Sequence, residues 1–217
     1  MSQPTDSSAR PWSPARFREA ARQIAATGQR IYSHGWSPAT SSNYSMRLND
    51  HYCAVTVSGR DKGQLTETDI MVVDLDNQPA SPGKPSAETG LHTQLYRQLP
   101  DAGAVLHTHS AASTVLTMHY PHETVWRLQG YELLKAFSGV TTHDWQLDIP
   151  VFDNTQDIDL LARHVEQAMA DGNISHAYLI RGHGVYTWAD TMEACYRQLE
   201  ALEFLFGVEV QRRQLRS

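Results

Sequence analysis

Residues 104–118, AVLHTHSAASTVLTM, change from the pattern of a strand to the pattern of a helix. Residues 104–106 are an apolar run, which is typical of a short buried strand, and residues 111–118 have helical spacing. His107 and His109 lie between them and are expected on one face, because side chains two residues apart on an extended segment point the same way. The stretch therefore predicts two adjacent imidazoles at a strand-to-helix junction.

A third histidine follows a second apolar run. Residues 177–180 predict a buried strand, and His183 comes soon after it between two glycines, which let the backbone approach closely. Catalytic zinc sites use three protein ligands and leave one position open. His107, His109 and His183 are thus candidate zinc ligands, although a lone HxH pair suits two hydrogen-bonded histidines at a strand end equally well. The remaining histidines considered lie in a helical pattern or in polar stretches and are not expected to be ligands: His92, His119, His122 and His143.

The rest of the chain alternates strand and helix patterns with no linker or repeat, which predicts one α/β domain over residues 13–217. Residues 1–12 are polar and rich in Ser and Pro, so a disordered lead-in is expected there. Further strands are expected at 52–57, 70–75, 125–128 and 149–152, the first two paired in one sheet. Helices are expected from Ser13 to Gly28, over 86–98 and 158–169, and from a capping box at Asp190 and Glu193 onward, with a helical turn or two at 131–137.

Composition excludes several classes of protein. Apolar residues make up 41% and charged residues 19% of the 217 residues, as in an ordinary globular domain. No apolar stretch approaches the roughly 20 residues of a membrane span. The 18 basic and 24 acidic residues give a net charge of -6 without a basic cluster, so neither a membrane nor nucleic acid is an expected partner. Cys53 and Cys195 lie far apart with no CxxC motif and no signal-peptide pattern, which predicts a reducing cytoplasm and no disulfide framework.

Two glutamates are candidates for acid or base chemistry. Glu88 lies at an expected helix start, where the helix dipole favours a carboxylate and Ser86 can cap the helix, so a purely structural role also explains it. Glu132 lies among apolar neighbours in GYELLKA, residues 130–136, where burial would raise its pKa toward a value useful for proton transfer. A solvated helix residue is the alternative for Glu132.

Two polar loops flank expected strands, TSSN at residues 40–43 and SGRDKG at residues 58–63. Such loops present backbone N–H groups and hydroxyls to an anion, and Arg60 or Lys62 would add positive charge. Taken alone they are ordinary turns. The chain has no P-loop motif, no GxGxxG opening a helix and no GxSxG elbow, which excludes the P-loop, Rossmann and α/β-hydrolase classes.

Six segments, taken in order, resemble the class II aldolase and adducin family. They are TSSNYSMR at 40–47, VSGRDKG at 57–63, LTETDI at 65–70, KPSAETGLH at 84–92, VLHTHS at 105–110 and RGHGVY at 181–186. Each is weak alone, but the likeness runs from about Phe17 to about Val210. SGRDK, GYELLKA and HGVYTW are most similar to the methionine-salvage dehydratase branch of that family. The resemblance implies a three-layer α/β/α fold around a central mixed, largely antiparallel sheet.

The resemblance also implies ligand-binding roles. One zinc ion per subunit is expected on the three histidines named above, and a sugar phosphate on the residues Asn43, Ser58, Gly59 and Ser86. Many aldolases have a second serine where this chain has Ala87, so that phosphate contact is absent or is supplied by Lys62.

The catalytic role is implied for two positions. In the dehydratase branch a glutamate after the HTH motif acts as acid and base, and it corresponds to Glu132. Glu132 is therefore the first candidate to protonate the departing C4 hydroxyl and to take the C3 proton. Glu88 stands where the aldolases keep their catalytic glutamate and is the secondary candidate, so the division of roles stays open. The implied activity is zinc-dependent dehydration of a phosphorylated ketose, 5-methylthioribulose 1-phosphate, by a cytoplasmic homotetramer. A sugar-phosphate aldolase or epimerase is the alternative, and a non-catalytic interaction protein, as in the cytoskeletal member of the family, is a third.

Overall fold

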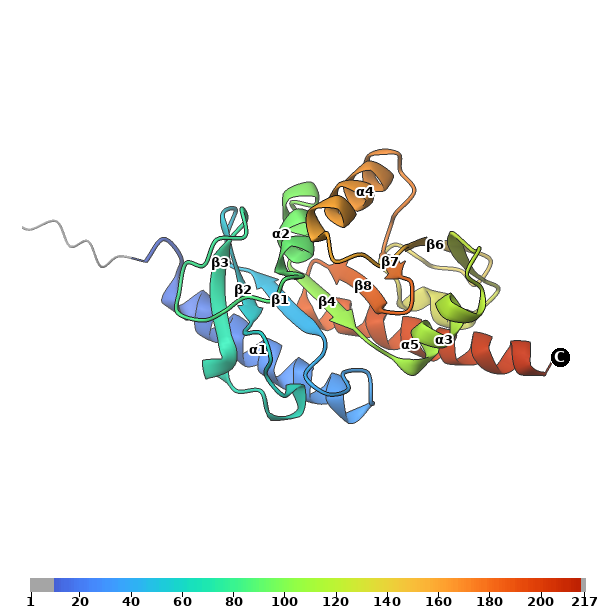
Figure 1. The fold of residues 1–217 in the computed structure, drawn as a ribbon, viewed down its shortest axis with the longest axis horizontal. Helices are drawn as coiled ribbons and strands as arrows, with labels where there is room; N and C mark the ends of the chain where they lie inside the picture. Colours follow the sequence, from blue (N-terminus) through green and yellow to red (C-terminus); the bar gives the residue numbers. More distant parts are fainter. Residues whose placement is uncertain (1–9, 216–217) are drawn as a thin grey trace, which may run out of the picture.

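The structure, a computed structural model, describes residues 10–215 and contains one eight-stranded sheet with the order β3-β2-β1-β4-β8-β7-β6-β5 (Figure 1). Neighbouring strands are antiparallel except β6 and β7, which are parallel. The strands are β1 (Asn43–Arg47), β2 (Tyr52–Thr56), β3 (Ile70–Asp74), β4 (Ala104–Thr108), β5 (Val125–Gln129), β6 (Gln146–Phe152), β7 (Ala177–Ile180) and β8 (Gly184–Ala189). The expected pairing of β2 with β3 is confirmed.

Helices cover both faces of the sheet, so the expected three-layer α/β/α architecture is confirmed. They are α1 (Pro14–Ser33), α2 (Thr89–Gln98), α3 (Ala111–His119), α4 (Ile158–Ala170) and α5 (Met192–Gln214), with short 3₁₀ turns η1 (Lys62–Gln64), η2 (Glu67–Asp69) and η3 (Glu132–Ala136). α1, α3 and α5 pack into one hydrophobic core on one face. α2 and α4 pack into a second core on the other face (Figure 1).

Side chains of β4 point alternately to the two faces of the sheet, so the strand contributes residues to both cores. All five residues of β4 are buried; Leu106 belongs to the core under α5 and Val105 to the core under α2. Following the same alternation, His107 stacks on Tyr186 on the α2 side, with ring centroids 4.0 Å apart. Thr108 points the other way, and its hydroxyl donates to Glu203 Oε1 on α5 at 2.6 Å. The HTH segment is therefore anchored on both faces of the sheet.

The two cysteines are distributed between the two cores. Cys53 lies in the core under α2 and α4, and Cys195 lies in the core under α1, α3 and α5. Both are buried and free. Burial raises the pKa of the Cys53 thiol to about 12 and also raises that of Cys195.

Helix α1 does not end at Gly28, where the sequence pattern placed its end, but continues to Ser33. A Cβ at Gly28 would lie 2.6 Å from Leu65 Cδ1 and 2.9 Å from Tyr44 Cε2. This glycine thus allows close packing of the helix on its neighbours and does not stop it. The expected start is confirmed, since Ser13 caps α1 and Pro14 is its first residue.

Several other expectations differ in detail. No strand is expected at 43–47 or 184–189, yet these residues form β1 and β8, which flank β4 in the sheet. The N-cap of α5 is Thr191, whose side chain accepts from Ala194 N, and not Asp190. Of the expected lead-in, residues 1–9 lie outside the described residues, while Trp12 is 6% exposed and packs 5.2 Å from the ring of Tyr52. No helix within residues 10–215 has the length and hydropathy of a membrane span.

Gly103, just before β4, offers a test of the packing. Gly103→Ala is expected to lower the free energy of unfolding by about 3 kcal/mol, because the added Cβ would lie 1.9 Å from the carbonyl oxygen of Asp190. That backbone has no room to move, since Gly103 N donates to Ala189 O at 2.8 Å. Urea unfolding measures the difference. Gly207→Ala in α5 is the matched control, because nothing lies within 4 Å of its added Cβ, and equal midpoints for the two variants would contradict the close contact.

Candidate active site

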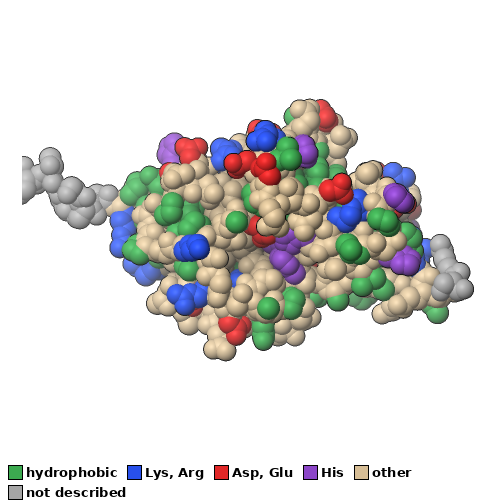
Figure 2. All heavy atoms as spheres, in the orientation of Figure 1, with side chains coloured by type: hydrophobic (Ala, Val, Ile, Leu, Met, Phe, Trp, Pro, Cys, Tyr) green, Lys and Arg blue, Asp and Glu red, His purple; other side chains and the backbone are tan. Residues whose placement is uncertain are grey.

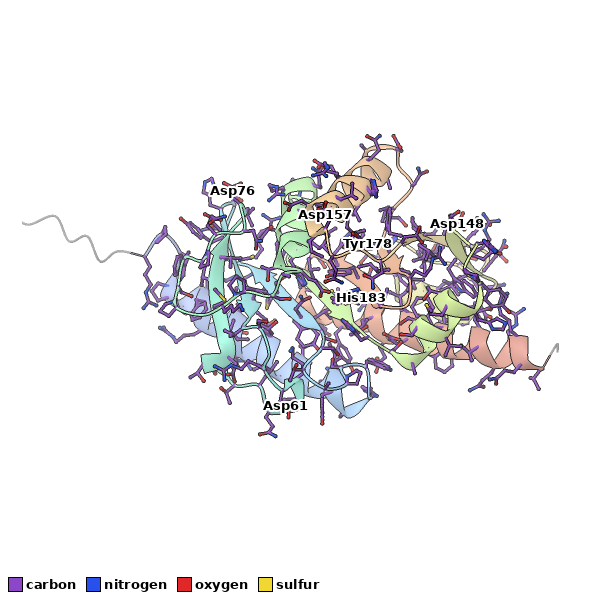
Figure 3. All side chains as sticks on the ribbon, in the orientation of Figure 1. Asp61, Asp76, Asp148, Asp157, Tyr178 and His183 are labelled. Carbon is purple, nitrogen blue, oxygen red and sulfur yellow. The ribbon has the colours of Figure 1, made fainter. Side chains whose placement is uncertain are left out.

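Two neighbouring strands bring the three candidate histidines together. β4 and β8 are antiparallel, with Thr108 opposite Val185, so the end of β4 meets the beginning of β8. His183 lies in the three-residue turn between β7 and β8, and Figure 3 labels it near the centre of the molecule. The ring centroids of His107, His109 and His183 are 4.5 to 5.0 Å apart. The structure thus places His183 beside His107 and His109, from which it is more than seventy positions away in the sequence.

Two of the three histidine rings, His107 and His109, are held in the neutral form that binds metals. His107 is fully buried, and its Nδ1 lies 3.0 Å from Val185 O, so Nδ1 carries the proton and Nε2 keeps its lone pair. That Nε2 faces His183 Nε2 at 3.3 Å. Burial lowers the pKa of His107 well below its usual range, and burial together with the charge of His183 lowers the pKa of His109 to about 4. Neutral imidazoles are the state in which histidine ligates a metal.

His109 carries an unsatisfied buried atom. Its Nε2 has no hydrogen-bond partner within the described chain, although buried polar atoms normally have one. Ligand atoms of Glu88, His107, His109 and His183 all lie within 4.8 Å of one another. Figure 2 shows histidine and acidic side chains together in a hollow near the middle of this face. The group fits a metal ion, and the lone pair of His109 is the feature that a cation would satisfy.

Glu88 lies beside the histidines. The expected helix start at Ser86 is wrong by three residues: α2 begins at Thr89, Glu88 is its N-cap residue, and the backbone N–H of Glu88 donates to Ser86 Oγ at 3.3 Å. Its Oε1 lies 2.9 Å from His183 Nε2, and its Oε2 lies 3.5 Å from His107 Nε2. Burial alone would raise the pKa of Glu88, but the hydrogen bond and the electrostatic interaction with His183 are the main causes that outweigh it and lower the pKa. An ionised carboxylate therefore adjoins the candidate metal ligands.

Glu132 is placed differently from the expectation. Its side chain is 72% exposed on η3, where it is hydrogen-bonded to Lys135 and lies 3.8 Å from His143. The expectation that burial raises its pKa is wrong, because the hydrogen bond from Lys135 lowers it. Of the two leucines that follow it in the sequence, Leu134 turns into the core whereas Leu133 is 39% exposed, and Glu132 faces outward with Leu133. Glu132 is not in the group of four side chains described above.

The expected phosphate-binding residues line one cavity of about 200 Å³. They are Asn43, Ser58, Gly59, Lys62 and Ser86, and Glu88 and His109 are also among the lining residues. The two polar loops recognised in the sequence thus come together at one end of the candidate metal centre.

Lys62 joins the two loops. Its side chain is 1% exposed, and its ammonium group donates to Thr40 O at 3.1 Å and to Arg60 O at 2.8 Å. Burial lowers the pKa of Lys62 to about 8, so the group is still mostly cationic at pH 7. Two of its three protons are used by these carbonyl oxygens, and the third is available to an anion in the cavity.

Two further residues adjoin the site. Asn154, in the loop after β6, places its Oδ1 3.4 Å from His183 Nδ1, and no motif pointed to it. His92, which is not expected as a ligand, is fully buried behind Asn43, with Nε2 2.6 Å from Asn43 Oδ1. Its four-residue spacing from Glu88 was the signal that placed both on one face of a helix.

The chain matches known proteins over most of its length. A profile of the class II aldolase and adducin N-terminal domain matches residues 22–210. A methylthioribulose-1-phosphate dehydratase from Alcanivorax borkumensis is 66% identical over 208 residues, which cover 96% of this chain and 98% of that protein. A protein of the same name from Xanthomonas campestris pv. campestris is 52% identical over 208 residues, 95% of each chain. Among solved structures, an L-fuculose-1-phosphate aldolase from Thermus thermophilus has a TM-score of 0.70 and 25% identity, covering 93% of this chain and 97% of that one.

Proposed function

This chain belongs to the class II aldolase and adducin family, and from that premise we propose that it dehydrates 5-methylthioribulose 1-phosphate to 2,3-diketo-5-methylthiopentyl 1-phosphate in methionine salvage. The observation that carries the proposal is the 66% identity, over 96% of the chain, with a protein named methylthioribulose-1-phosphate dehydratase. The enzyme is accordingly a hydro-lyase. Residues 13–217 form its single catalytic domain in this proposal.

The proposed metal is one zinc ion, held by His107, His109 and His183. Three imidazoles with converging ring nitrogens match the ligand set of a catalytic zinc site, and the unsatisfied Nε2 of His109 supports the assignment. When bound, the ion supplies Lewis-acid charge beside the reacting carbonyl.

The phosphate is proposed to bind in the cavity beside the histidines. Lys62 supplies the positive charge there, and Asn43, Ser58 and Ser86 supply polar side chains. Gly59 has a φ of 74°, a left-handed conformation that exposes its backbone in the loop. A phosphate held at this end directs the carbon chain of the substrate toward Glu88 and His109, because both line the same cavity.

Glu88 is proposed to carry the proton transfer. Its lowered pKa keeps it ionised and able to accept the proton from C3 of the ketose. Loss of the C4 hydroxyl as water then gives an enol, which becomes the 2,3-diketone when C4 takes up a proton. The proton that Glu88 has taken from C3 is the first candidate source for the leaving hydroxyl. Glu132 is the second candidate for this acid, because its side chain is exposed whereas Glu88 lies beside the histidines.

The reaction itself is tested by mass spectrometry. The purified protein is loaded with zinc, given 5-methylthioribulose 1-phosphate, and compared with a sample treated with a chelator. Loss of one water that the chelator abolishes is the expected result. Carbon–carbon cleavage fragments would show an aldolase instead, and an unchanged substrate in the presence of metal-loaded protein would contradict the proposal.

Lys62→Met is expected to raise KM for the phosphorylated ketose by roughly 10- to 100-fold, the value of a charge-assisted hydrogen bond. In the unaltered protein KM should also rise above about pH 8, because the pKa of Lys62 is lowered to about 8 and only the protonated amine attracts phosphate. Steady-state kinetics between pH 6.5 and 9.5 measure both effects. Lys84→Met, with an exposed side chain on the neighbouring loop, is the control, and a KM that stays flat through pH 9 would count against the role of Lys62.

We propose that the protein is a cytoplasmic homotetramer, as the family resemblance implies. Large apolar side chains on the surface support an assembly, among them Phe204 on α5, which is 59% exposed, and Met118 on α3, which is 60% exposed. Light scattering on the purified protein measures the subunit number, and a monomer at micromolar concentration would contradict the assembly.

A further inference from the structure

A line of buried polar side chains runs from Glu88 away from the histidine group. Asn43 Nδ2 donates to Glu88 Oε2 at 3.4 Å, and Asn43 Oδ1 lies 2.6 Å from His92 Nε2. His92 Nδ1 lies 2.7 Å from Ser45 Oγ, and Ser45 Oγ lies 2.9 Å from the hydroxyl of Tyr96. The four residues behind Glu88 are each 2% exposed or less, so water does not compete for these contacts.

The line follows from the regular geometry of two elements. Glu88, His92 and Tyr96 are spaced by four residues, which places them on one face of α2 at successive turns. Asn43 and Ser45 are two apart on β1 and therefore share the face that α2 covers (Figure 1). Successive residues along the line therefore come alternately from α2 and from β1.

Hydrogen-bond chemistry allows one arrangement of protons along this line. Full burial lowers the pKa of His92 to about 3, so its ring is neutral and offers one donor and one acceptor. Asn43 Oδ1 can only accept, so the proton is on His92 Nε2, and Nδ1 accepts from the Ser45 hydroxyl. The opposite orientation of the Asn43 amide would place Oδ1 against the Glu88 carboxylate, two acceptors facing each other.

We propose that His92 is a positioning residue: its Nε2–H fixes the amide of Asn43 so that Nδ2 faces the Glu88 carboxylate and the phosphate cavity. This inference rests on the proposed function, because it assumes that Glu88 takes part in the reaction. His92 itself is hydrogen-bonded to Asn43 and Ser45 and not to a candidate metal ligand. Without the His92 donor, the amide of Asn43 is free to rotate, and both the carboxylate and the bound phosphate lose an N–H partner.

Two substitutions separate positioning from simple filling of space. His92→Gln places an amide N–H where Nε2 lies and can still reach Asn43, whereas His92→Asn is one methylene shorter and reaches only the Nδ1 position, next to Ser45. The expected result is that kcat/KM stays within about threefold in the Gln variant and falls roughly 10- to 100-fold in the Asn variant. Equal losses in both, relative to the unaltered protein, would overturn the proposal.

A double-mutant cycle tests whether His92 acts through Asn43. In an Asn43→Ala background, His92→Asn is expected to cause no further loss of kcat/KM, because the group that it orients is gone. An additive loss would show that His92 acts by another route. Urea unfolding identifies any variant that fails to fold. If the double variant does not fold, the comparison of kcat/KM between His92→Gln and His92→Asn decides the question.

A binding measurement makes this test independent of the dehydration reaction. Isothermal calorimetry with inorganic phosphate is expected to give similar Kd values for the unaltered protein and His92→Gln, and a roughly tenfold weaker Kd for His92→Asn. If the protein fails to dehydrate the ketose but this pattern holds, the proposed function fails and the role of His92 stands. If dehydration is confirmed and both His92 variants bind phosphate and turn over substrate equally, the role of His92 fails.

Discussion

His109→Ala is expected to abolish metal binding and to lower kcat/KM by roughly a thousandfold or more, as loss of several kcal/mol of Lewis-acid stabilisation implies. The sheet should remain folded, because His109 follows the last residue of β4 and the unsatisfied side-chain nitrogen bonds nothing else within residues 10–215. Only His107 and His183 would remain as imidazole ligands. Metal content by mass spectrometry, kcat/KM, and circular dichroism measure the three parts of this expectation.

The matched control for this variant is His122→Ala, which removes an exposed histidine from the turn between α3 and β5. It should retain metal and activity. A His109→Ala protein that still held one equivalent of metal and turned over at the normal rate would remove His109 from the site.

Glu88→Gln is expected to lower kcat by roughly 100- to 10,000-fold, the usual contribution of a general base. Glutamine keeps the shape and the hydrogen-bonding oxygen but cannot take a proton from C3. Because Glu88 is beside the histidines and is not one of the three proposed ligands, metal content should stay near one per chain. Stopped assays over minutes to hours, with metal measured on the same samples, give the result.

Glu132→Gln is the comparison that divides the roles of the two carboxylates. Its side chain is 72% exposed and hydrogen-bonded to Lys135, so turnover within about threefold of normal is expected if Glu88 performs the proton transfer. The reverse pattern, with Glu132→Gln inactive and Glu88→Gln active, would assign the acid and base role to Glu132.

The sequence alone identified the histidines because their signal is local. An HxH pair at a strand end and a histidine after a short apolar run are visible in single stretches, and the structure brings them together at the junction of β4 and β8. The fold class could be predicted for a similar reason, since most strands and helices have clear periodicity. Residues 184–189, GVYTWA, also carried a strand signal in Val185, Tyr186 and Trp188, which was not recognised.

The features that could not be predicted from the sequence depend on side-chain orientation and on packing between distant segments. The environment of Glu132 is decided by which side of a short 3₁₀ turn faces the core, and apolar neighbours in the sequence do not determine that. Gly28 is an ordinary helix stop in sequence, but its role is set by Leu65 and Tyr44, which reach it from other elements. The contact between Asn43 and His92 joins residues forty-nine positions apart, so it became visible only when α2 was seen against β1.

The two free thiols, one in each hydrophobic core, can serve as internal reporters of how the layers open. A buried thiol with a raised pKa reacts with an alkylating agent only when local or global unfolding exposes it as thiolate. Labelling of Cys195 would follow the release of α5 from its face of the sheet, and labelling of Cys53 would follow the release of α2 and α4 from the other. If the two thiols react at one common rate under native conditions, the three layers unfold as a single cooperative unit; if Cys53 reacts first, the α2 layer that carries Glu88 and His92 opens on its own.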